Sequence, residues 1–382
     1  MSRRRGSALI VAVILVVSAG CASGAHSGAA RSPSTAAHPT SARVRATTTA
    51  TTAPATTTTT TLPPLPAPTV AARRAIFGAA NVDAGGYLPT DRVIVSWLGI
   101  ASLAASFDGQ VVLLDTYLNN APPATCTSGS SPSDTATVGY SRTSYDQLVA
   151  LRPEVVFIGH GHFDHECLAG TIAATDGALL VGLPQDCALA QQQAARAGMA
   201  TPVRCGPTVA ADAPFGTTAQ IQPLGPAVPI TVVRHVHSGL ASGAVQNTNG
   251  AESLLYVFHV GAFSLAWNDT VGPLREKAPA VLDVLKGLGP VDVEFGAILG
   301  LDVPEHGFRD PADYAQALAA KELFPLHHDE TRAPGASTPF RGPMVAALAA
   351  SPGARTTLHW LQDPTDYLRP LVFDPTAARW GH

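Results

Sequence analysis

Three histidines and an aspartate stand within residues 160–165, directly after an apolar run that is typical of a buried strand. At the end of a strand, residues two apart point to the same side, so His160 and His162 can reach one cation. Asp164 and His165 face elsewhere and are free to hold a second one. Because neutral imidazoles and carboxylates are ligands that zinc and similar metals prefer, this spacing indicates a metal-binding loop rather than a histidine-rich surface loop.

Two cations need more ligands than one loop provides, and further candidates follow apolar runs downstream. These runs end in His235 and His237, in Asp269, and in His327 and His328. A single histidine at a strand end is usually a hydrogen-bonded structural residue. Together with the first loop, however, these residues form a set that two metal ions can share.

Such a set predicts hydrolytic chemistry on a small-molecule substrate. Two divalent cations about 3.5 to 4 Å apart, with Zn²⁺ favoured, can share a water and lower its pKa enough to give hydroxide near neutral pH. This hydroxide would attack a carbonyl carbon or a phosphorus, while Asp164 or a nearby histidine, His165, protonates the leaving oxygen. No serine or cysteine nucleophile is needed, so we interpret Ser253 and Cys167 as structural residues.

Strands and helices are expected to alternate around these residues. Asp108-Gly109 predicts a hairpin between strands at 101–107 and 110–115. Asp186 is expected to cap a helix that runs to residue 197. Further strands are predicted over 92–97, 155–158, 178–182, 230–234, 254–260, 262–267, 291–299 and 323–326, and helices over 145–151, 167–174, 279–288 and 311–319. Hairpins in both halves, with helices between them, favour an α+β sandwich of two mixed sheets with helices outside.

The order of the motifs resembles the metallo-β-lactamase superfamily: His-x-His-x-Asp-His, then His, Asp and His at later strand ends. Residues 95–99, 113–115 and 324–329 are similar to the branch that contains ascorbate-6-phosphate lactonases and N-acyl-phosphatidylethanolamine phospholipase D. The resemblance covers residues 92–329. It implies the αβ/βα four-layer sandwich of that superfamily and cleavage of an ester-type bond, with phosphodiesters and lactones favoured.

The resemblance also implies a role for each candidate residue. Asp115 corresponds to an aspartate that orients a ligand histidine and fixes its tautomer. His235 stays an alternative to His237, because both are expected on one side of a strand, although the residues after His237 match the superfamily better. The implied ligands are His160, His162 and His237 for the first metal, Asp164, His165 and His327 for the second, and Asp269 as a bridge between them.

The N-terminus is typical of an export signal, predicted over residues 1–21. A basic start, Arg3–Arg5, precedes an uncharged apolar core at 8–17, which is too short to span a bilayer because that needs about 20 apolar residues. Residues 17–21 resemble the cleavage box of bacterial lipoproteins, in which Cys21 becomes lipidated. The protein is therefore expected outside the cytoplasm, either anchored by lipid to the outer side of the cell membrane or, as the alternative, secreted.

A stretch rich in threonine and proline follows and has few large apolar side chains, so it cannot offset the entropy of ordering. We predict a disordered linker over residues 22–75 and one hydrolase domain over 76–382. The composition suits an O-glycosylated spacer and a plain flexible linker equally, and it does not separate the two.

Cysteine content and net charge bear on the disulfides and the partners of the protein. In an exported protein, the four cysteines after Cys21 favour two disulfides. Three connectivities are possible, and the expected one pairs Cys187 with Cys205 and Cys126 with Cys167. The formal net charge of −4 disfavours a nucleic-acid partner, which would need a basic face. Membrane contact is expected only through the N-terminal anchor.

A second hypothesis from a different class is a surface-tethered binding protein that contains metal without turnover. The complete ligand set favours the enzyme, since a protein freed from catalysis has little physical reason to keep two open metal positions.

Overall fold

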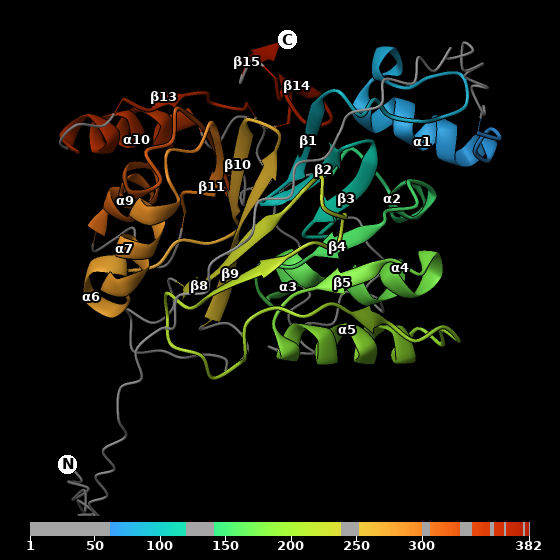
Figure 1. The fold of residues 1–382 in the computed structure, drawn as a ribbon, viewed down its shortest axis with the longest axis horizontal. Helices are drawn as coiled ribbons and strands as arrows, with labels where there is room; N and C mark the ends of the chain where they lie inside the picture. Colours follow the sequence, from blue (N-terminus) through green and yellow to red (C-terminus); the bar gives the residue numbers. More distant parts are fainter. Residues whose placement is uncertain are drawn as a thin grey trace, which may run out of the picture. The chain divides into compact units, whose positions relative to one another are not determined.

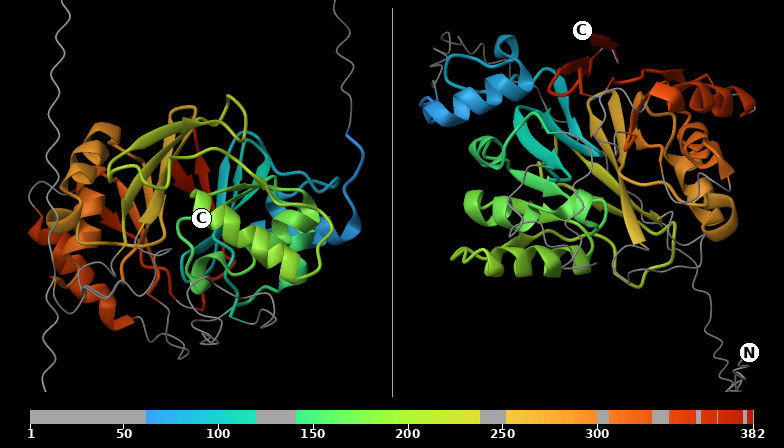
Figure 2. Two further views of the ribbon diagram at one scale, coloured as in Figure 1. Left: turned by 90° about the horizontal axis from the view of Figure 1, so that it is seen from below. Right: turned by 180° about the vertical axis from the view of Figure 1, so that it is seen from behind.

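Two β-sheets face each other in the computed structural model, which describes residues 62–119, 141–237, 252–299, 306–328, 338–351, 355–362, 364–376 and 379–381. The strand order is β15-β14-β1-β2-β3-β4-β5-β6 in the first sheet and β13-β12-β11-β10-β9-β8-β7 in the second. Figure 1 shows helices on the outer side of each sheet, and the views in Figure 2 show the same layers from below and from behind. The predicted four-layer αβ/βα sandwich is therefore confirmed.

The first sheet and its helices come from the N-terminal half of the folded part, with two strands added from the C-terminal end. Its strands are β1 Val93–Gly99, β2 Ser102–Phe107, β3 Gln110–Leu114, β4 Val155–Phe157, β5 Leu179–Val181, β6 Arg204–Cys205, β14 Leu371–Asp374 and β15 Arg379–Gly381. The accompanying helices are α1 Ala67–Phe77, the 3₁₀ helix η1 Ala79–Asn81, α2 Tyr145–Ala150, α3 Phe163–Glu166, α4 Ala169–Asp176 and α5 Pro184–Arg196.

The second sheet and its helices come from the C-terminal half. Its strands are β7 Thr218–Ile221, β8 Ile230–Val236, β9 Glu252–Val260, β10 Phe263–Asn268, β11 Val293–Ala297, β12 Glu322–Leu326 and β13 Thr357–Leu358. The helices are α6 Leu274–Lys277, α7 Pro279–Leu288, α9 Arg309–Ala317 and α10 Thr338–Ala350.

Each sheet is mixed. Strands β1 to β3 form an antiparallel meander, and its second turn has Asp108 and Gly109 at positive φ, as a two-residue hairpin of type I′ requires. Strands β3 to β5 and β10 to β12 are parallel and are joined through helices. Parallel strands place their carboxyl ends at one edge of a sheet, so residues that follow β3, β4, β10 and β12 gather there.

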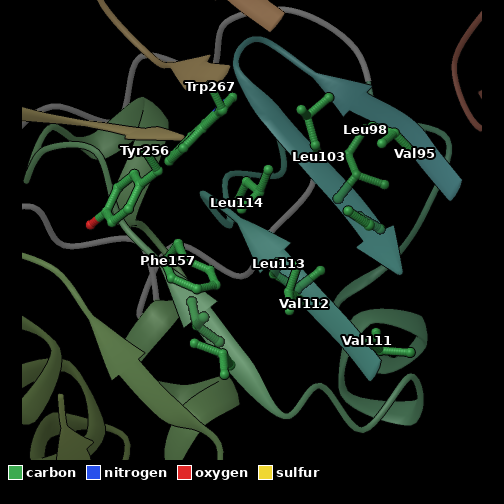
Figure 3. Packing of buried hydrophobic residues seen from close by; sticks show 14 of the residues in the cluster. Val95, Leu98, Leu103, Val111, Val112, Leu113, Leu114, Phe157, Tyr256 and Trp267 are labelled. Atoms are coloured by element: carbon green, nitrogen blue, oxygen red, sulfur yellow. The ribbon is translucent and has the colours of Figure 1, made fainter. Parts of the chain in front are cut away.

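Aromatic and aliphatic side chains from both sheets fill the space between them. Phe157 of β4 packs edge-on against Tyr256 of β9 with ring centroids 5.2 Å apart, and Tyr256 stacks on Trp267 of β10 at 5.7 Å. Figure 3 shows Leu114 and Phe157 of the first sheet beside these two rings of the second. Each fully buried side chain of this size contributes about 1.5–3 kcal/mol, so this core holds the sheets, and the strand ends they carry, in a fixed relation.

A second apolar core lies between the second sheet and its helices. Val233 and Leu255 of the sheet, Val281 and Leu285 of α7 and Tyr314 of α9 are all buried in it. Helix α7 occupies the predicted range 279–288, with Pro279 in its first turn.

The linker prediction was wrong at its C-terminal end. Helix α1 begins at Ala67, packs on β1 and buries Ala72 and Ile76, so the ordered chain begins before residue 76. The threonine- and proline-rich composition continues into the first turn of this helix, where Pro68 is tolerated because the first helical N–H groups have no partner within the helix. The predicted signal peptide, the lipidation site Cys21 and most of the linker lie outside the described residues.

The helix expected at 167–174 corresponds to α4, and a separate short helix, α3, precedes it inside the motif. Asp186 caps α5 from its first turn rather than as the N-cap residue, because its Oδ2 accepts from the backbone N–H of Leu183 at 2.8 Å.

Cys187 in α5 and Cys205 in β6 are the predicted partners that the fold brings together, with their Cα atoms 6.1 Å apart. Cys167 is also disulfide-bonded, and its predicted partner Cys126 lies outside the described residues. In the part of the chain described, no helix has the length and apolar character needed to cross a membrane.

Candidate metal centre

The predicted ligands lie where strands of both sheets end. His160 and the rest of its loop follow β4, and His237, Asp269 and His327 follow β8, β10 and β12 of the opposite sheet. The centre therefore lies across the edge of the sandwich, and both sheets contribute to it.

His160, His162 and His237 form the first donor group. One ligand atom of each lies within 4.8 Å of the others, and the three ring centroids are 4.5 to 4.6 Å apart. Burial lowers the pKa of all three imidazoles, and for His160 and His237 the neighbouring histidines lower it further. The rings are therefore neutral near pH 7, which is the form that binds a metal.

Asp164, His165 and His327 form the second donor group. The Nε2 atoms of His165 and His327 are 3.1 Å apart, and Asp164 Oδ2 lies 3.3 Å from His327 Nε2 and 3.7 Å from His165 Nε2. Burial opposes ionisation of Asp164, but His165 and His327 hold the pKa of this carboxyl well below its usual range. An ionised carboxylate and two imidazoles thus converge on one point.

Asp269 lies between the two groups. Its Oδ2 accepts from His160 Nδ1 at 2.6 Å and lies 3.4 Å from His165 Nδ1, and the three residues form a donor group of their own. The side chain is fully buried. Asp269 is therefore within reach of residues from both donor groups.

Two buried atoms at this position have no hydrogen-bond partner among the described residues: Nε2 of His160 and Oδ1 of Asp269. Buried polar atoms are almost always paired, so unpaired ones indicate a missing ion or water. Burial and the neighbouring Asp269 also raise the pKa of Asp115, and nearby cations would relieve both carboxyls. The nitrogen and oxygen donors present therefore fit divalent cations of the zinc type.

Neighbouring groups hold these ligands in place. Oδ2 of Asp115 accepts from His165 Nδ1 at 2.7 Å and its Oδ1 accepts from the backbone N–H of Gly159 at 3.2 Å, so the Nε2 of His165 is the nitrogen turned toward the second group. This agrees with the predicted role of Asp115. The hydroxyl of Tyr256 donates to the backbone carbonyl of Ile158 at 2.8 Å, which fixes the end of β4 from the opposite sheet.

Gly159 gives Asp269 the room to reach its neighbours. A Cβ atom at this position would lie 2.1 Å from Cγ of Asp269, closer than any real contact. The roles of Gly159 and Tyr256 were missed at the level of sequence, because both depend on contacts between segments far apart in the chain.

The structure separates His235 from His237. Strand β8 ends at Val236, so His237 has left the strand and turns toward His160 and His162. His235 is still in the strand and hydrogen-bonds through Nδ1 with the hydroxyl of Tyr314 at 2.7 Å. The expectation that both histidines lie on one side was wrong, because it assumed that the strand continues past Val236.

The remaining candidates lie outside these groups. His328 is buried with its ring 5.1 Å from that of Trp97 and 4.4 Å from that of Trp360, so it has a packing role. Glu276, His306 and Asp310 also cluster, but Arg309 donates to Glu276 and Asp310 at 2.8 Å each. An arginine already neutralises this cluster, so we do not assign it a metal.

No protein-family model matches the chain, and no curated protein matches it in sequence. Solved structures match its fold. Igni18, a metallo hydrolase from Ignicoccus hospitalis, aligns with a TM-score of 0.47 and 14% identity over 74% of this chain and 98% of its own. Unliganded yeast PDE1 aligns with a TM-score of 0.47 and 9% identity over 71% and 97%.

A third match, from Thermotoga maritima, is described as a Zn-dependent hydrolase of the metallo-β-lactamase superfamily. It aligns with a TM-score of 0.30 and 14% identity over 62% of this chain and 76% of its own. Similarities this distant indicate nothing about the substrate. What the structure itself shows is the αβ/βα sandwich expected from the sequence, with two facing mixed sheets and helices outside them.

Proposed function

We propose that the protein is a hydrolase with two divalent metal ions, with Zn²⁺ favoured, that cleaves an ester-type bond. The observation that carries this proposal is the overlap of three donor groups. His160, His165 and Asp269 form a middle group that lies between the first and the second. His160 also belongs to the first group, and His165 also belongs to the second. Such an overlap suits two adjacent cations, whereas one structural ion would need a single closed group of four ligands.

Cations in these groups would supply Lewis acidity and lower the pKa of a water molecule. The protein residues would orient the reactants and carry protons. Asp164 is suited to the proton transfer because it is ionised and its side chain is 15% exposed, whereas Asp269 is fully enclosed. Oδ2 of Asp164 would accept a proton from the attacking water and deliver it to the leaving oxygen, whereas both ring nitrogens of His165 are engaged, Nδ1 by Asp115 and Nε2 by the second donor group.

Neither Ser253 nor Cys167 can serve as a nucleophile. Both side chains are fully buried, and Cys167 is disulfide-bonded. Water is therefore the nucleophile in this proposal, as two-metal hydrolysis requires.

Phosphodiesters and lactones are the proposed substrates. The support is the resemblance of residues 95–99, 113–115 and 324–329 to the branch with ascorbate-6-phosphate lactonases and N-acyl-phosphatidylethanolamine phospholipase D. We further propose export and a lipid anchor at Cys21, on the basic start, the apolar core and the residues before that cysteine.

Chelation and reloading test the activity. The purified protein is stripped with a chelator, reloaded with Zn²⁺ and assayed on bis-p-nitrophenyl phosphate and a panel of lactones. We expect hydrolysis to be lost on stripping and restored on reloading, and Asp164→Asn to lower kcat by a factor of roughly 100 or more. A protein that holds two metals and hydrolyses nothing in the panel would instead be the tethered binding protein.

A further inference from the structure

A buried polar cluster lies directly behind Asp269, on the helix-facing side of the second sheet. It consists of Asn268 at the end of β10 and of Glu294 and Gly296 in the parallel neighbour β11, where Gly296 pairs with Asn268. Asn268 and Glu294 are 0% and 1% exposed, respectively. Because Asn268 immediately precedes Asp269, whatever holds its side chain also fixes the turn that presents Asp269.

Two acceptor oxygens face the same small space in this cluster. A Cβ atom at Gly296 would lie 2.9 Å from Glu294 Oε1 and 3.1 Å from Asn268 Oδ1. The orientation of the Asn268 amide is set by its nitrogen, which donates to the backbone carbonyl of Thr270 at 3.3 Å. Oδ1 is therefore the amide atom that borders this space together with Oε1 of Glu294, and glycine at 296 leaves the space open.

Each of the two side chains carries an oxygen that lacks a donor. Within the described part of the chain, Oδ1 of Asn268 has no hydrogen-bond partner, and in the Glu294 carboxyl group the unpaired oxygen is Oε2. An ionised carboxylate and an amide oxygen that border one space repel, and each unpaired acceptor costs about 1–3 kcal/mol. A proton on Glu294 removes both problems, because its O–H can donate to the amide oxygen.

The surroundings favour that proton. Burial alone raises the pKa of Glu294 to about 8. The groups that interact across this region are Tyr314 and Asp310 of α9, Asp269 after β10 and His235 of β8, and burial lowers the pKa of His235 to about 4, so it is neutral. No cation among these groups holds Glu294 in its ionised form.

We propose that Glu294 is a positioning residue whose protonated carboxyl donates to Asn268 Oδ1 and so fixes the turn that presents Asp269 to the metals. This role rests on the proposed two-metal function and adds to it a residue with no contact to substrate. It also sets an upper pH limit, because ionisation of Glu294 restores two facing acceptors behind Asp269.

The direction of the pH effect follows from the shift. Below the ordinary value of 4.5, Glu294 is protonated in both the folded and the unfolded chain. Between pH 4.5 and about 8, only the folded chain keeps the proton. The free energy of unfolding therefore falls as the pH rises through this range, and it falls no further above about pH 8. Glu294→Gln keeps the shape and an N–H donor but cannot ionise, so its urea midpoint should exceed that of the wild type by an amount that grows across this window.

Three variants test the role. Glu294→Gln keeps the hydrogen-bond donor, and Glu294→Met removes it at similar volume. Glu154→Gln is the control. It removes a carboxyl that accepts from the Val111 N–H in the first sheet, far along the chain from Asp269. The readouts are Co²⁺ affinity, the absorption spectrum of the Co²⁺-loaded protein, and the infrared difference spectrum against the wild type at neutral pH.

We expect the Gln variant to bind Co²⁺ within about twofold of the wild type, with an unchanged spectrum that persists above pH 8, where the wild-type spectrum changes. The Met variant should bind roughly tenfold more weakly, the usual effect of removing a group behind a ligand. Glu154→Gln should change neither quantity. The Gln variant should also lose the carbonyl band of a protonated carboxylic acid.

The role of Glu294 would be overturned if the Gln variant kept this band, or if the Met variant bound Co²⁺ as tightly as the wild type. If the Met variant does not fold, the band and the pH dependence of the Gln variant still decide. A wild-type protein that binds no Co²⁺ but shows the band contradicts the two-metal function and the positioning role, yet leaves the protonation of Glu294 established, so the two failures are distinguishable.

Discussion

At the scale of single residues, the centre is a set of imidazoles and carboxylates whose orientations are fixed by neighbours. Asp115 turns Nε2 of His165 toward His327, and Asp269 contacts His160 and His165 together. The sequence predicts the residues of this set because histidine and aspartate at strand ends are a local signal. It could not separate His235 from His237, since the end of β8 depends on its pairing with β9.

This distinction gives a prediction about two residues only two positions apart. His237→Ala should lower the metal content by one ion per chain, because the first donor group loses a ligand. His235→Ala should keep both ions and lower the free energy of unfolding by about 1–3 kcal/mol, because the buried Tyr314 hydroxyl loses its hydrogen bond with His235. Metal analysis by plasma emission after gel filtration, combined with urea unfolding, checks both. The reverse pattern of metal loss would refute the assignment of His237.

At the scale of elements, the positions of the ligands depend on where strands and helices end. Strands β1 to β3 and helix α7 could be predicted, because hairpin residues and amphipathic spacing are signals within a short stretch of sequence. Helix α1 could not be predicted, since its first turn shares the composition of the linker before it. The short α3 was missed because the ligand spacing in its sequence gives no helical period.

Gly159, two residues after the last residue of β4, should be sensitive to a single methyl group. Gly159→Ala should abolish binding of the second metal and lower stability by about 1–3 kcal/mol, because the new Cβ would overlap the Asp269 carboxylate. Gly287→Ala is the matched control, since a Cβ in this position of α7 meets nothing within 4 Å and alanine favours the helix by up to about 1 kcal/mol. Metal content and thermal unfolding measure the two effects. Full metal content in the Gly159→Ala variant would show that Asp269 does not need this space.

At the scale of the whole molecule, two sheets bring together ligands that are more than 160 residues apart, such as His165 and His327. The alternation of helices and hairpins predicts the layered class. It does not predict that β14 pairs with β1, or that Tyr256 of one sheet supports the metal loop of the other, because such contacts depend on long-range packing. For the same reason the signal for Glu294 is absent from the sequence.

The metal content of the purified protein tests the central claim most directly. Plasma emission on wild type and on Asp269→Ala, both equilibrated with Zn²⁺ and freed of excess metal, should give two ions per wild-type chain and at most one per variant chain. The difference follows because Asp269 is the carboxylate that lies between the two donor groups. Fewer than one ion per wild-type chain, or two ions retained by the variant, would contradict a two-metal centre bridged by Asp269.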